Sequence, residues 1–355
     1  MKIIITTQTF PPKIGGMQSV MRSLTEKFGK EFKTIVLPNH YVSKKTFKET
    51  ENIKIFNSIL PKFLKPFIKR LIIRIIGNKE DIFICDSWKS VNSIPHLFSE
   101  NIFVLAHGQE LIGKKNHSTK IIKSLSRVKA IISNSSYTMS LAKKISKKLN
   151  YVIPPTYMLP NNIIKKTMIN DVLNILTIAR IEERKGIFNS LKALHRIYIS
   201  NKKIKFLWHI VGDGPQLNQI KKYIYDNKLE KIVICYGFVS EKVKENLFIQ
   251  SDIFLMPSFR FKNSIEGFGI VYSEAARYGI PSIIGIDGGS NDAVINNQTG
   301  WSVDGKEPKI LEKKLVNILS NRNQIIKYGQ ASQKLYLENF TGECVFNKFK
   351  EILIN

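Results

Sequence analysis

The stretch DIFLMPS at 252–258, followed by SIEGFGIVYSEAARYGIP at 264–281, joins an apolar run, a turn with two glycines and a helical pattern. The run predicts a strand, and the turn exposes backbone amides at the start of the predicted helix. Glu266 lies in the turn and Glu274 lies within the helix. Because an ionised carboxylate only accepts hydrogen bonds, two of them aimed at one place predict a ligand rich in hydroxyl groups.

This alternation of apolar runs with helical patterns extends over the whole chain. Near-continuous apolar runs separated by helices are typical of parallel sheets that are covered on both faces. Two such series, interrupted near the proline-containing stretch 151–166, predict an α/β protein with Rossmann-like domains at 1–165 and 166–340. Ligands of such sheets bind beyond the carboxyl ends of the strands, so the predicted site is a cleft between the domains. The runs are 2–6, 34–37, 53–56, 81–85, 102–106, 129–132, 173–179, 205–211, 231–235, 252–256 and 281–285.

The cysteines and the apolar segments indicate a protein of a reducing compartment. Cys85, Cys235 and Cys344 are odd in number and far apart, so they predict neither a disulfide framework nor a zinc site. The apolar residues at 2–6 are too few for a signal peptide. The most apolar stretch, 71–77, contains an arginine and is too short to span a bilayer. We therefore expect a cytoplasmic location.

The net charge of +27 is the most unusual property of the composition. Residues 1–150 hold 27 Lys and Arg against 9 Asp and Glu, whereas residues 151–355 hold 28 against 19. A basic half of this kind predicts an anionic partner, such as nucleic acid, a membrane surface or a phosphorylated substrate. For most individual lysines the alternative is a merely solvated surface.

Two motifs that follow predicted strands contain groups suited to a diphosphate. In PPKIGGMQSV, Gly15 and Gly16 open a helix whose first amides lack intrahelical partners, which is favourable for an anion. In ARIEERKG, Arg180 ends a strand and Lys185 precedes a helix, so the two cations could clamp a diphosphate without a metal. The alternative for PPKIGGMQSV is a plain strand–helix turn. The alternative for ARIEERKG is a surface cluster of charges.

Two further motifs follow strands and are weaker signals. His107 in AHGQE lies at the carboxyl end of a predicted strand, where it could bind a sugar hydroxyl. A lone histidine is more often a hydrogen-bonded loop residue. Gly212 in VGDGP belongs to a turn with a proline near the first helical position, which we interpret as mainly structural and at most as lining a nucleotide site.

Taken together, the motifs resemble a family-4 retaining glycosyltransferase of the GT-B fold, within the glycosyl transferases group 1. The resemblance rests on PPKIGGMQSV, AHGQE, ARIEERKG, VGDGP, SDIFLMPS, EGFGIVYSEA and GIPSIIGIDGGSNDAVINNQTGWSVDG, in the family's order and spacings over most of the chain. It implies a nucleotide-diphosphate sugar as donor, retention at the anomeric carbon and no metal or other cofactor. It also implies that a last helix, about 341–355, returns to the first domain.

The resemblance assigns roles to individual residues. Glu266 would face the donor sugar, Glu274 the ribose, and Arg180 with Lys185 the diphosphate, while His107 would lie near the donor sugar. The predicted catalytic residues are therefore His107, Arg180, Lys185 and Glu266. The predicted donor-binding residues are Gly15, Gly16, Gly212, Gly267, Phe268, Gly269, Ile270 and Glu274.

Two positions depart from the family's pattern. Gln18 stands where many relatives carry Glu, which weakens a carboxylate role there. The family's GGxPE reads GGSND, with Asn291 and Asp292. Donor specificity is therefore not transferable from any relative, and both a UDP-sugar and a GDP-sugar remain open.

Residues 60–80 mix basic and apolar side chains that separate onto two faces of a helix from about residue 66. Such a helix could lie on an anionic bilayer, where each basic residue contributes about 1 kcal/mol. Because the first domain is the acceptor domain by resemblance, we expect a peripheral enzyme at the inner face of the cell membrane. Packing of this helix on the sheet is the alternative. The residues predicted to meet membrane or acceptor are Lys65, Phe67, Lys69, Arg70 and Arg74.

The leading hypothesis is transfer of a hexose-type sugar from a nucleotide-diphosphate sugar to a membrane lipid or lipid-linked glycan. A soluble acceptor, or another nucleotide-sugar reaction on the same fold such as epimerisation, is the first alternative. A nucleic-acid-binding protein is the remote one, because only charge supports it and no reading module is recognisable.

Overall fold

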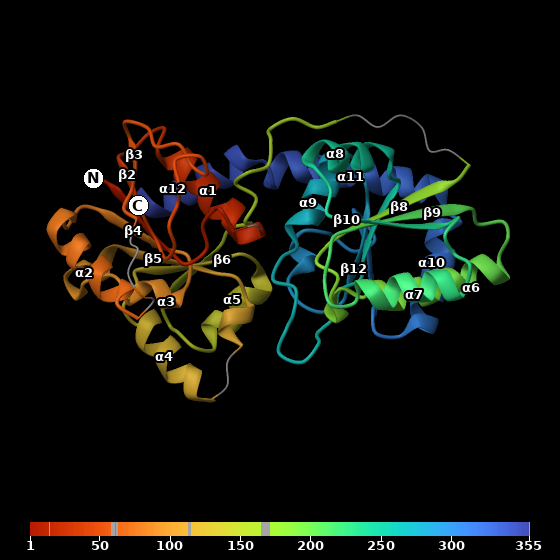
Figure 1. Ribbon diagram of the computed structural model, residues 1–355, viewed down its shortest axis with the longest axis horizontal. Helices are drawn as coiled ribbons and strands as arrows, with labels where there is room; N and C mark the ends of the chain where they lie inside the picture. Colours follow the sequence, from red (N-terminus) through yellow and green to blue (C-terminus); the bar gives the residue numbers. More distant parts are fainter. Residues whose placement is uncertain (14, 58–60, 62, 113–114, 165–170, 355) are drawn as a thin grey trace. The chain divides into compact units, whose positions relative to one another are not determined.

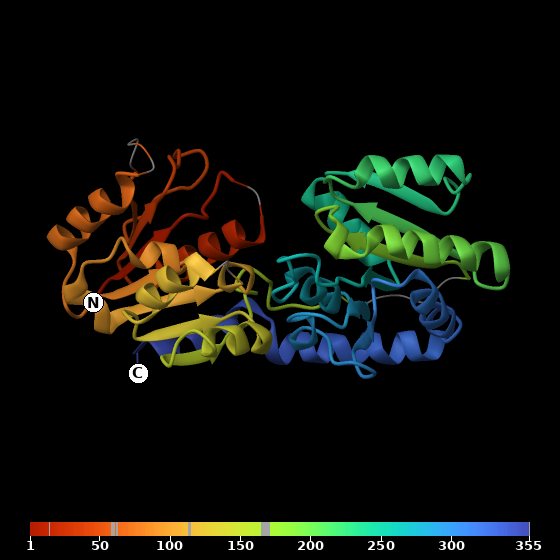
Figure 2. The same ribbon diagram turned by 90° about the horizontal axis from the view of Figure 1, so that it is seen from below.

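The computed structural model describes residues 1–13, 15–57, 61, 63–112, 115–164 and 171–354 (Figure 1). It divides the chain into two compact units. Unit 1 comprises Met1–Leu159 and Thr341–Asn355, and unit 2 comprises Pro160–Phe340. Both chain ends therefore belong to unit 1 (Figure 2). The domain boundary predicted at 165–166 lies outside the described residues.

Unit 1 is built on a parallel sheet with the strand order β3-β2-β1-β4-β5-β6-β7. The central strands are buried along their whole length, as their apolar runs predict for a sheet covered on both faces. The edge strand β7 was missed by sequence reasoning because its residues, LNYV, are half exposed and form no continuous apolar run. The strands are β1 (Ile3–Thr7), β2 (Thr34–Pro38), β3 (Ile53–Ile55), β4 (Ile82–Cys85), β5 (Ile102–Ala106), β6 (Ala130–Ser133) and β7 (Leu149–Val152).

Helices cover both faces of this sheet, and the last helix of the chain is one of them. The ring of Phe28 in α1 lies 4.9 Å from that of Phe346 in α12, and Lys350 Nζ lies 2.9 Å from Glu31 Oε2. The helices of unit 1 are α1 (Gly16–Phe28), α2 (Lys65–Ile76), α3 (Trp88–Val91), α4 (Lys115–Leu125), α5 (Ser136–Lys143) and α12 (Gly342–Ile354), with 3-10 turns η1 (His96–Asn101) and η2 (Gln109–Leu111).

Unit 2 is built on a second parallel sheet, with the strand order β10-β9-β8-β11-β12-β13. Trp208 and Trp301 are fully buried in its core, and the indole N–H of Trp208 donates to Thr177 Oγ1 at 3.0 Å. The edge strand β13 was also missed, because it contributes only GWSV. The strands are β8 (Leu173–Ile178), β9 (Phe206–Val211), β10 (Val233–Gly237), β11 (Ile253–Met256), β12 (Ser282–Gly285) and β13 (Gly300–Val303).

The order of the strands decides which loops of unit 2 meet. Because β8 lies between β9 and β11, and β12 follows β11, the loops at the carboxyl ends of these strands are neighbours. They contain four of the sequence motifs. The helices of unit 2 are α6 (Ile187–Ser200), α7 (Leu217–Asp226), α8 (Glu241–Gln250), α9 (Ile270–Arg277), α10 (Pro308–Leu319) and α11 (Arg322–Asn339), with 3-10 turns η3 (Glu183–Lys185) and η4 (Ser290–Asp292).

Candidate active site

A cluster of charges lies where the loops after β8 and β11 meet. Lys185 ends η3, Glu266 lies between β11 and α9, and the Lys185 ammonium donates to Glu266 Oε2. Arg184 Nη1 donates to the same oxygen at 3.0 Å. The structure therefore brings together two residues that the sequence motifs predicted separately, and it adds Arg184, which sequence reasoning missed. The signal for Arg184 was its place beside Lys185, but nothing in the sequence shows which way its side chain points.

The environment of this cluster favours the ionised carboxylate. Burial by itself raises the pKa of Glu266, but the charges and hydrogen bonds of Lys185 and Arg184 outweigh burial and hold this pKa below its usual value. Burial also lowers the pKa of Lys185, which is 8% exposed, and the Glu266 carboxylate opposes that shift. Because both hydrogen bonds use Oε2, the described residues leave Glu266 Oε1 without a protein donor.

Two glycines hold the backbone on either side of this pair. Gly186 adopts a left-handed conformation with φ of 70°, and a Cβ there would lie 2.5 Å from the carbonyl oxygen of Pro257. Gly288, in the loop after β12, has φ of 90°, and a Cβ there would lie 2.4 Å from the carbonyl oxygen of Glu266. The N–H of the next residue, Gly289, donates to that same carbonyl at 3.0 Å. Only glycine fits both positions without strain.

Arg180 differs from Lys185 in its exposure. Its side chain is 71% exposed, and Nη1 lies 2.9 Å from Glu182 Oε1. The other oxygen of Glu182 accepts from Arg184 Nε at 3.1 Å. Glu182 therefore links the predicted cation Arg180 to Arg184, and through it to the Glu266 cluster.

The glycine turn before α9 provides backbone donors. Gly269 is the N-cap of α9, with φ of 85°. Among the described residues, the N–H groups of Gly267, Phe268 and Gly269 have no hydrogen-bond partner. The side chain of Phe268 is buried, with its ring 5.8 Å from that of Phe340, so only the backbone of Phe268 is available to a ligand. Ile270 is half-buried as the first residue of α9.

Glu274 lies on α9 and has a partner that sequence reasoning missed. Lys244 on α8 donates from Nζ to Glu274 Oε1 at 2.8 Å, and both side chains are 22% exposed. Burial alone lowers the pKa of Lys244, but the Glu274 carboxylate raises it above its usual value. The neighbouring hydroxyl of Tyr272 donates to Met256 O at 2.7 Å and fixes α9 on β11.

Gly212 joins the carboxyl ends of β9 and β10 through its N–H and packs closely against the loop after β8. Its N–H donates to Gly237 O at 2.8 Å. A Cβ at this position would lie 1.9 Å from the carbonyl oxygen of Ala179. Its N–H is therefore used within the protein, which agrees with a mainly structural turn, and the prediction that Gly212 lines a nucleotide site stays a prediction.

In unit 1, Asp86 organises the loop after β1. This buried residue directly follows β4, and β4 pairs with β1. Its Oδ2 accepts from Thr7 Oγ1 at 2.9 Å, from Gln8 N at 2.7 Å and from Thr9 N at 2.9 Å. Its backbone carbonyl accepts from His107 Nε2 at 3.0 Å. Sequence reasoning missed Asp86, although an aspartate at the end of an apolar strand was the available signal.

His107 is held in one orientation at the carboxyl end of β5. Because the Asp86 carbonyl can only accept, Nε2 carries a proton, and in the neutral ring Nδ1 is then an acceptor. Nδ1 is buried and has no hydrogen-bond partner among the described residues. The backbone N–H of His107 donates to Glu110 Oε1 at 2.5 Å, which links the main chain at His107 to η2.

Gly15 and Gly16 lie at the start of α1 as the motif predicts. Gly15 is the N-cap and Gly16 is the first helical residue. The side chain of Gln18 turns back toward the cap, since its Oε1 lies 2.6 Å from where a Cβ of Gly15 would be. An uncharged amide therefore stands beside this helix terminus.

The structure corrects the prediction for two residues of the basic segment. Lys65 and Lys69 are buried and cannot meet a membrane. Lys65 Nζ donates to Asn39 O at 2.7 Å, and Lys69 Nζ donates to Asn39 Oδ1 at 2.5 Å, beside the carboxyl end of β2. Their long stems cross the apolar inner face of α2, which lets the ammonium groups reach these oxygens. Phe67, Arg70 and Arg74 are exposed, as predicted for a surface contact.

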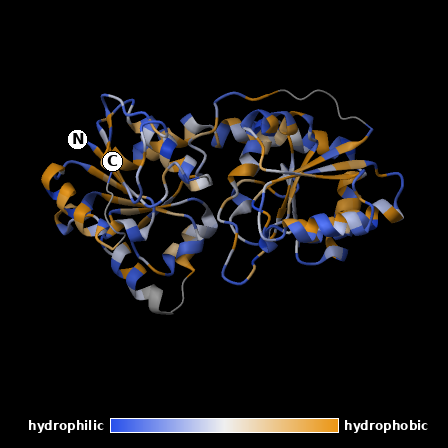
Figure 3. Ribbon diagram, viewed as in Figure 1, coloured by the Kyte–Doolittle hydropathy of each residue, from blue (hydrophilic) through white to orange (hydrophobic). Residues whose placement is uncertain are grey.

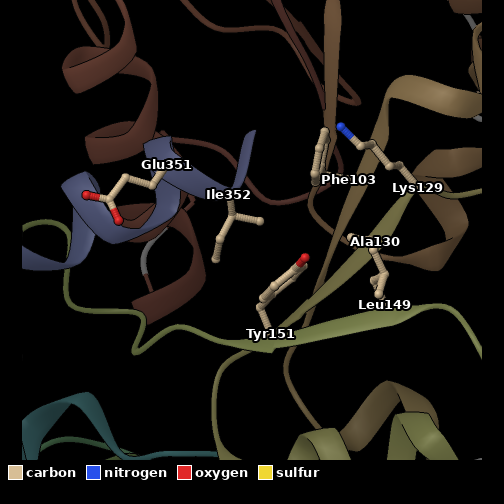
Figure 4. Close-up of a pocket in the computed structure, with 7 residues that line it drawn as sticks. All are labelled: Phe103, Lys129, Ala130, Leu149, Tyr151, Glu351 and Ile352. Carbon is tan, nitrogen blue, oxygen red and sulfur yellow. The ribbon is translucent and has the colours of Figure 1, made fainter. Parts of the chain in front are cut away.

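A separate cavity of about 330 Å³ lies in unit 1 between α12 and the strands β5, β6 and β7. Figure 4 shows its lining, in which residues of α12 lie opposite residues of β5, β6 and β7 and Lys129, which directly precedes β6. None of the predicted site residues belongs to it. The lining residues are Phe103, Lys129, Ala130, Leu149, Tyr151, Glu351 and Ile352.

Neither a metal cluster nor a membrane-spanning helix is present among the described residues. Within this part of the chain, no group of three or more His, Cys, Asp and Glu side chains could hold a metal ion. Within the same residues, every helix is too short or too polar to cross a membrane.

Comparisons with known proteins agree with this architecture. A solved structure of Anabaena Alr3699/HepE in complex with UDP and glucose superimposes with a TM-score of 0.78 at 15% identity, covering 99% of both chains. In sequence, a GDP-mannose-dependent alpha-(1-6)-phosphatidylinositol monomannoside mannosyltransferase of Mycobacterium tuberculosis is 29% identical over 41% of this chain and 38% of its own length. The putative colanic acid biosynthesis glycosyltransferase WcaL of Escherichia coli is 26% identical over 40% of this chain and 35% of its own length.

The matched segment coincides with unit 2. The alignments cover well under half of these two curated relatives. The glycosyl transferases group 1 family matches residues 161–334, which contain Lys185, Glu266 and Glu274. The parallel-sheet units and the structural neighbours establish the GT-B fold. Residues 161–334 of this chain are therefore a domain of the glycosyl transferases group 1 family.

Proposed function

We propose that the protein transfers a hexose-type sugar from a nucleotide-diphosphate sugar to a lipid or lipid-linked glycan. The observation that carries this proposal is the cluster in which Lys185 and Arg184 hold the Glu266 carboxylate beside a turn with unpaired amides. Cations and amides suit a diphosphate, and a fixed carboxylate suits sugar hydroxyls.

Each of these groups would bind the part of the donor that suits its chemistry. Amides of the turn at Gly267 and Gly269, with the cations of Arg180 and Lys185, would bind the diphosphate and stabilise the negative charge that develops on it. Glu266 Oε1 would accept from a hydroxyl of the transferred sugar. Glu274, held by Lys244, would accept from the ribose hydroxyls.

We propose that the reaction retains the anomeric configuration and needs no metal ion. The diphosphate would leave from the face that the acceptor hydroxyl enters, and an oxygen of the donor phosphate would take the hydroxyl proton. The cations already present support a route in which side chains, rather than a metal, balance the charge of the leaving group. His107 would accept from a donor-sugar hydroxyl through Nδ1, which otherwise remains an unmet acceptor.

The relatives support the class of acceptor. One is named for a phosphatidylinositol monomannoside and another for colanic acid biosynthesis, so lipids and polysaccharides are both represented. Donors differ among the similar proteins as well, since GDP-mannose is named for one and UDP for another. We therefore propose a lipid or lipid-linked acceptor and leave the base of the donor to experiment.

Donor binding is tested by thermal unfolding of the full chain with UDP, GDP and their sugars. A bound ligand raises the midpoint by mass action, so one nucleotide series should raise it and Glu274→Gln should reduce the rise. Product analysis by NMR with that donor would then give the anomeric configuration. Absence of a rise with every nucleotide, or loss of transfer in a chelator, would contradict the corresponding part of the proposal.

A further inference from the structure

An apolar stripe runs along the outer face of α2. It consists of Phe67, Leu71 and Ile75 of the helix, continued by Phe63 in the turn just before it, and these side chains are 42–84% exposed. Neighbours spaced four residues apart lie on one side of a helix, so Phe67, Leu71 and Ile75 form a continuous surface. Figure 3 shows α2 largely in the hydrophobic colours at the edge of unit 1.

The inner face of α2 is already occupied. Ile73 belongs to the core of unit 1, and the buried Lys65 and Lys69 bond to Asn39. Packing on the sheet therefore accounts for one face of the helix and leaves the stripe without a role in the fold.

Positive charge borders the stripe. Arg70 and Arg74 are exposed along one edge of it, and the helix contains no acidic residue. Arg70 Nη2 donates to Asn92 O at 2.6 Å, which is a neutral partner. Among the described residues Arg74 has no ion-pair partner, so both cations keep their charge for an outside anion.

We infer that this stripe and its two arginines bind the surface of an anionic bilayer, with the apolar side chains in the interface and the arginines at lipid phosphates. Such a division is what an interfacial helix requires. A second copy of the chain fits less well, because a symmetric contact would bring the arginines of two copies together. The inference deepens the proposed function by naming the surface on which a lipid acceptor would be met.

Binding of the full chain to vesicles tests this without any donor. The two vesicle types are phosphatidylcholine mixed with phosphatidylglycerol, and phosphatidylcholine alone. We expect binding to the anionic vesicles that weakens with salt. Phe67→Ser with Leu71→Ser, and separately Arg74→Glu, should each lower the partition coefficient at least about tenfold, or about 1.4 kcal/mol. Ile199→Ser with Tyr225→Ser, exposed apolar residues of unit 2, is the matched control and should bind as the wild type does.

Several results would overturn the inference. These are equal binding of the wild type to both vesicle types, no binding to either, or unchanged binding of both stripe variants. A dimer in solution that the Phe67→Ser and Leu71→Ser changes dissociate would assign the stripe to a second copy instead. Thermal unfolding of each variant checks that the fold is intact. Because nucleotide binding is measured separately, the proposed function and the membrane surface can fail independently.

Discussion

Arg184 and Glu266, 82 positions apart in the chain, are joined by a hydrogen bond of 3.0 Å from Nη1 to Oε2. The oxygen that Arg184 reaches is the same one that the buried Lys185 binds. Two adjacent residues of the loop after β8 thus fix one carboxylate of the loop after β11. The relationship makes Arg184 a positioning residue for Glu266, and it leads to the first two predictions.

Replacing Arg184 should disturb Glu266 without removing any predicted donor contact. Arg184→Ala removes one of the two charges that lower the pKa of Glu266, so this pKa should rise. If turnover needs the ionised carboxylate, the acidic limb of the pH–rate profile should move to higher pH. We also expect at least about a tenfold loss of kcat. Arg184→Lys should restore part of both effects.

Steady-state rates over a range of pH measure this. The matched control is Arg196→Ala, which removes an arginine that lies 3.6 Å from Glu312 and is half exposed. A profile of Arg184→Ala that is scaled down but not displaced would show that Arg184 does not act through the Glu266 charge.

Lys185 and Glu266 should be coupled in stability. Lys185→Met leaves a buried carboxylate with one cation fewer, and Glu266→Gln leaves two cations facing a neutral amide, so each change is destabilising. The double variant removes the Lys185 and Glu266 charges together and leaves Arg184 with its other partner, Glu182. We therefore expect it to be more stable than the sum of the single effects, by roughly 0.5–3 kcal/mol. Urea unfolding of the four proteins gives the coupling, and strict additivity would contradict a direct interaction.

Gly288→Ala should shift the backbone at Glu266. The substitution combines a left-handed backbone with a contact of 2.4 Å to the Glu266 carbonyl, and we expect a loss of about 1–3 kcal/mol of stability together with reduced turnover. Gly237→Ala separates the two causes, because Gly237 also has a positive φ but nothing lies within 4 Å of its Cβ position. If both variants lost the same free energy of unfolding, the contact with Glu266 would contribute nothing to the effect of Gly288→Ala.

The stability of unit 1 should depend on pH through Lys69. Burial lowers the pKa of its ammonium from 10.5 to about 8. Between these values the folded state has released the proton and the unfolded state still holds it, so the Lys69 contribution to stability rises with pH. Lys69→Met lacks this contribution. The free energy of unfolding of the wild type, relative to the variant, should therefore increase from about pH 8 to about pH 10.5.

Urea unfolding of both proteins at matched pH values measures this difference. Lys129→Met, at a half-buried lysine of the same unit, serves as the reference for general alkaline effects. If the difference in free energy of unfolding between the wild type and Lys69→Met stayed constant or became smaller with rising pH, burial would not lower the pKa of Lys69.

Much of the fold followed from local pattern. The strands of both sheets begin and end within a few residues of the predicted runs, because a strand buried on both faces must be apolar along its length. Strand β7 was not predicted because its residues are only partly buried and form no apolar run, and β13 was not predicted because its four residues, GWSV, include a glycine and a serine. The helix starts at Gly16 and Ile187 followed from their glycines.

The sequence by itself determined that Lys185, Glu266 and Glu274 lie after strands, at the edge of a sheet where ligands bind. Only the tertiary structure decided that Arg184 shares the Glu266 oxygen, that Lys244 holds Glu274, and that Asp86 ties the first loop to His107. It also turned Lys65 and Lys69 inward, against the prediction from the helix pattern. The reason is physical: periodicity tells which face of an element is apolar, but the partner of a charged side chain depends on which strands become neighbours.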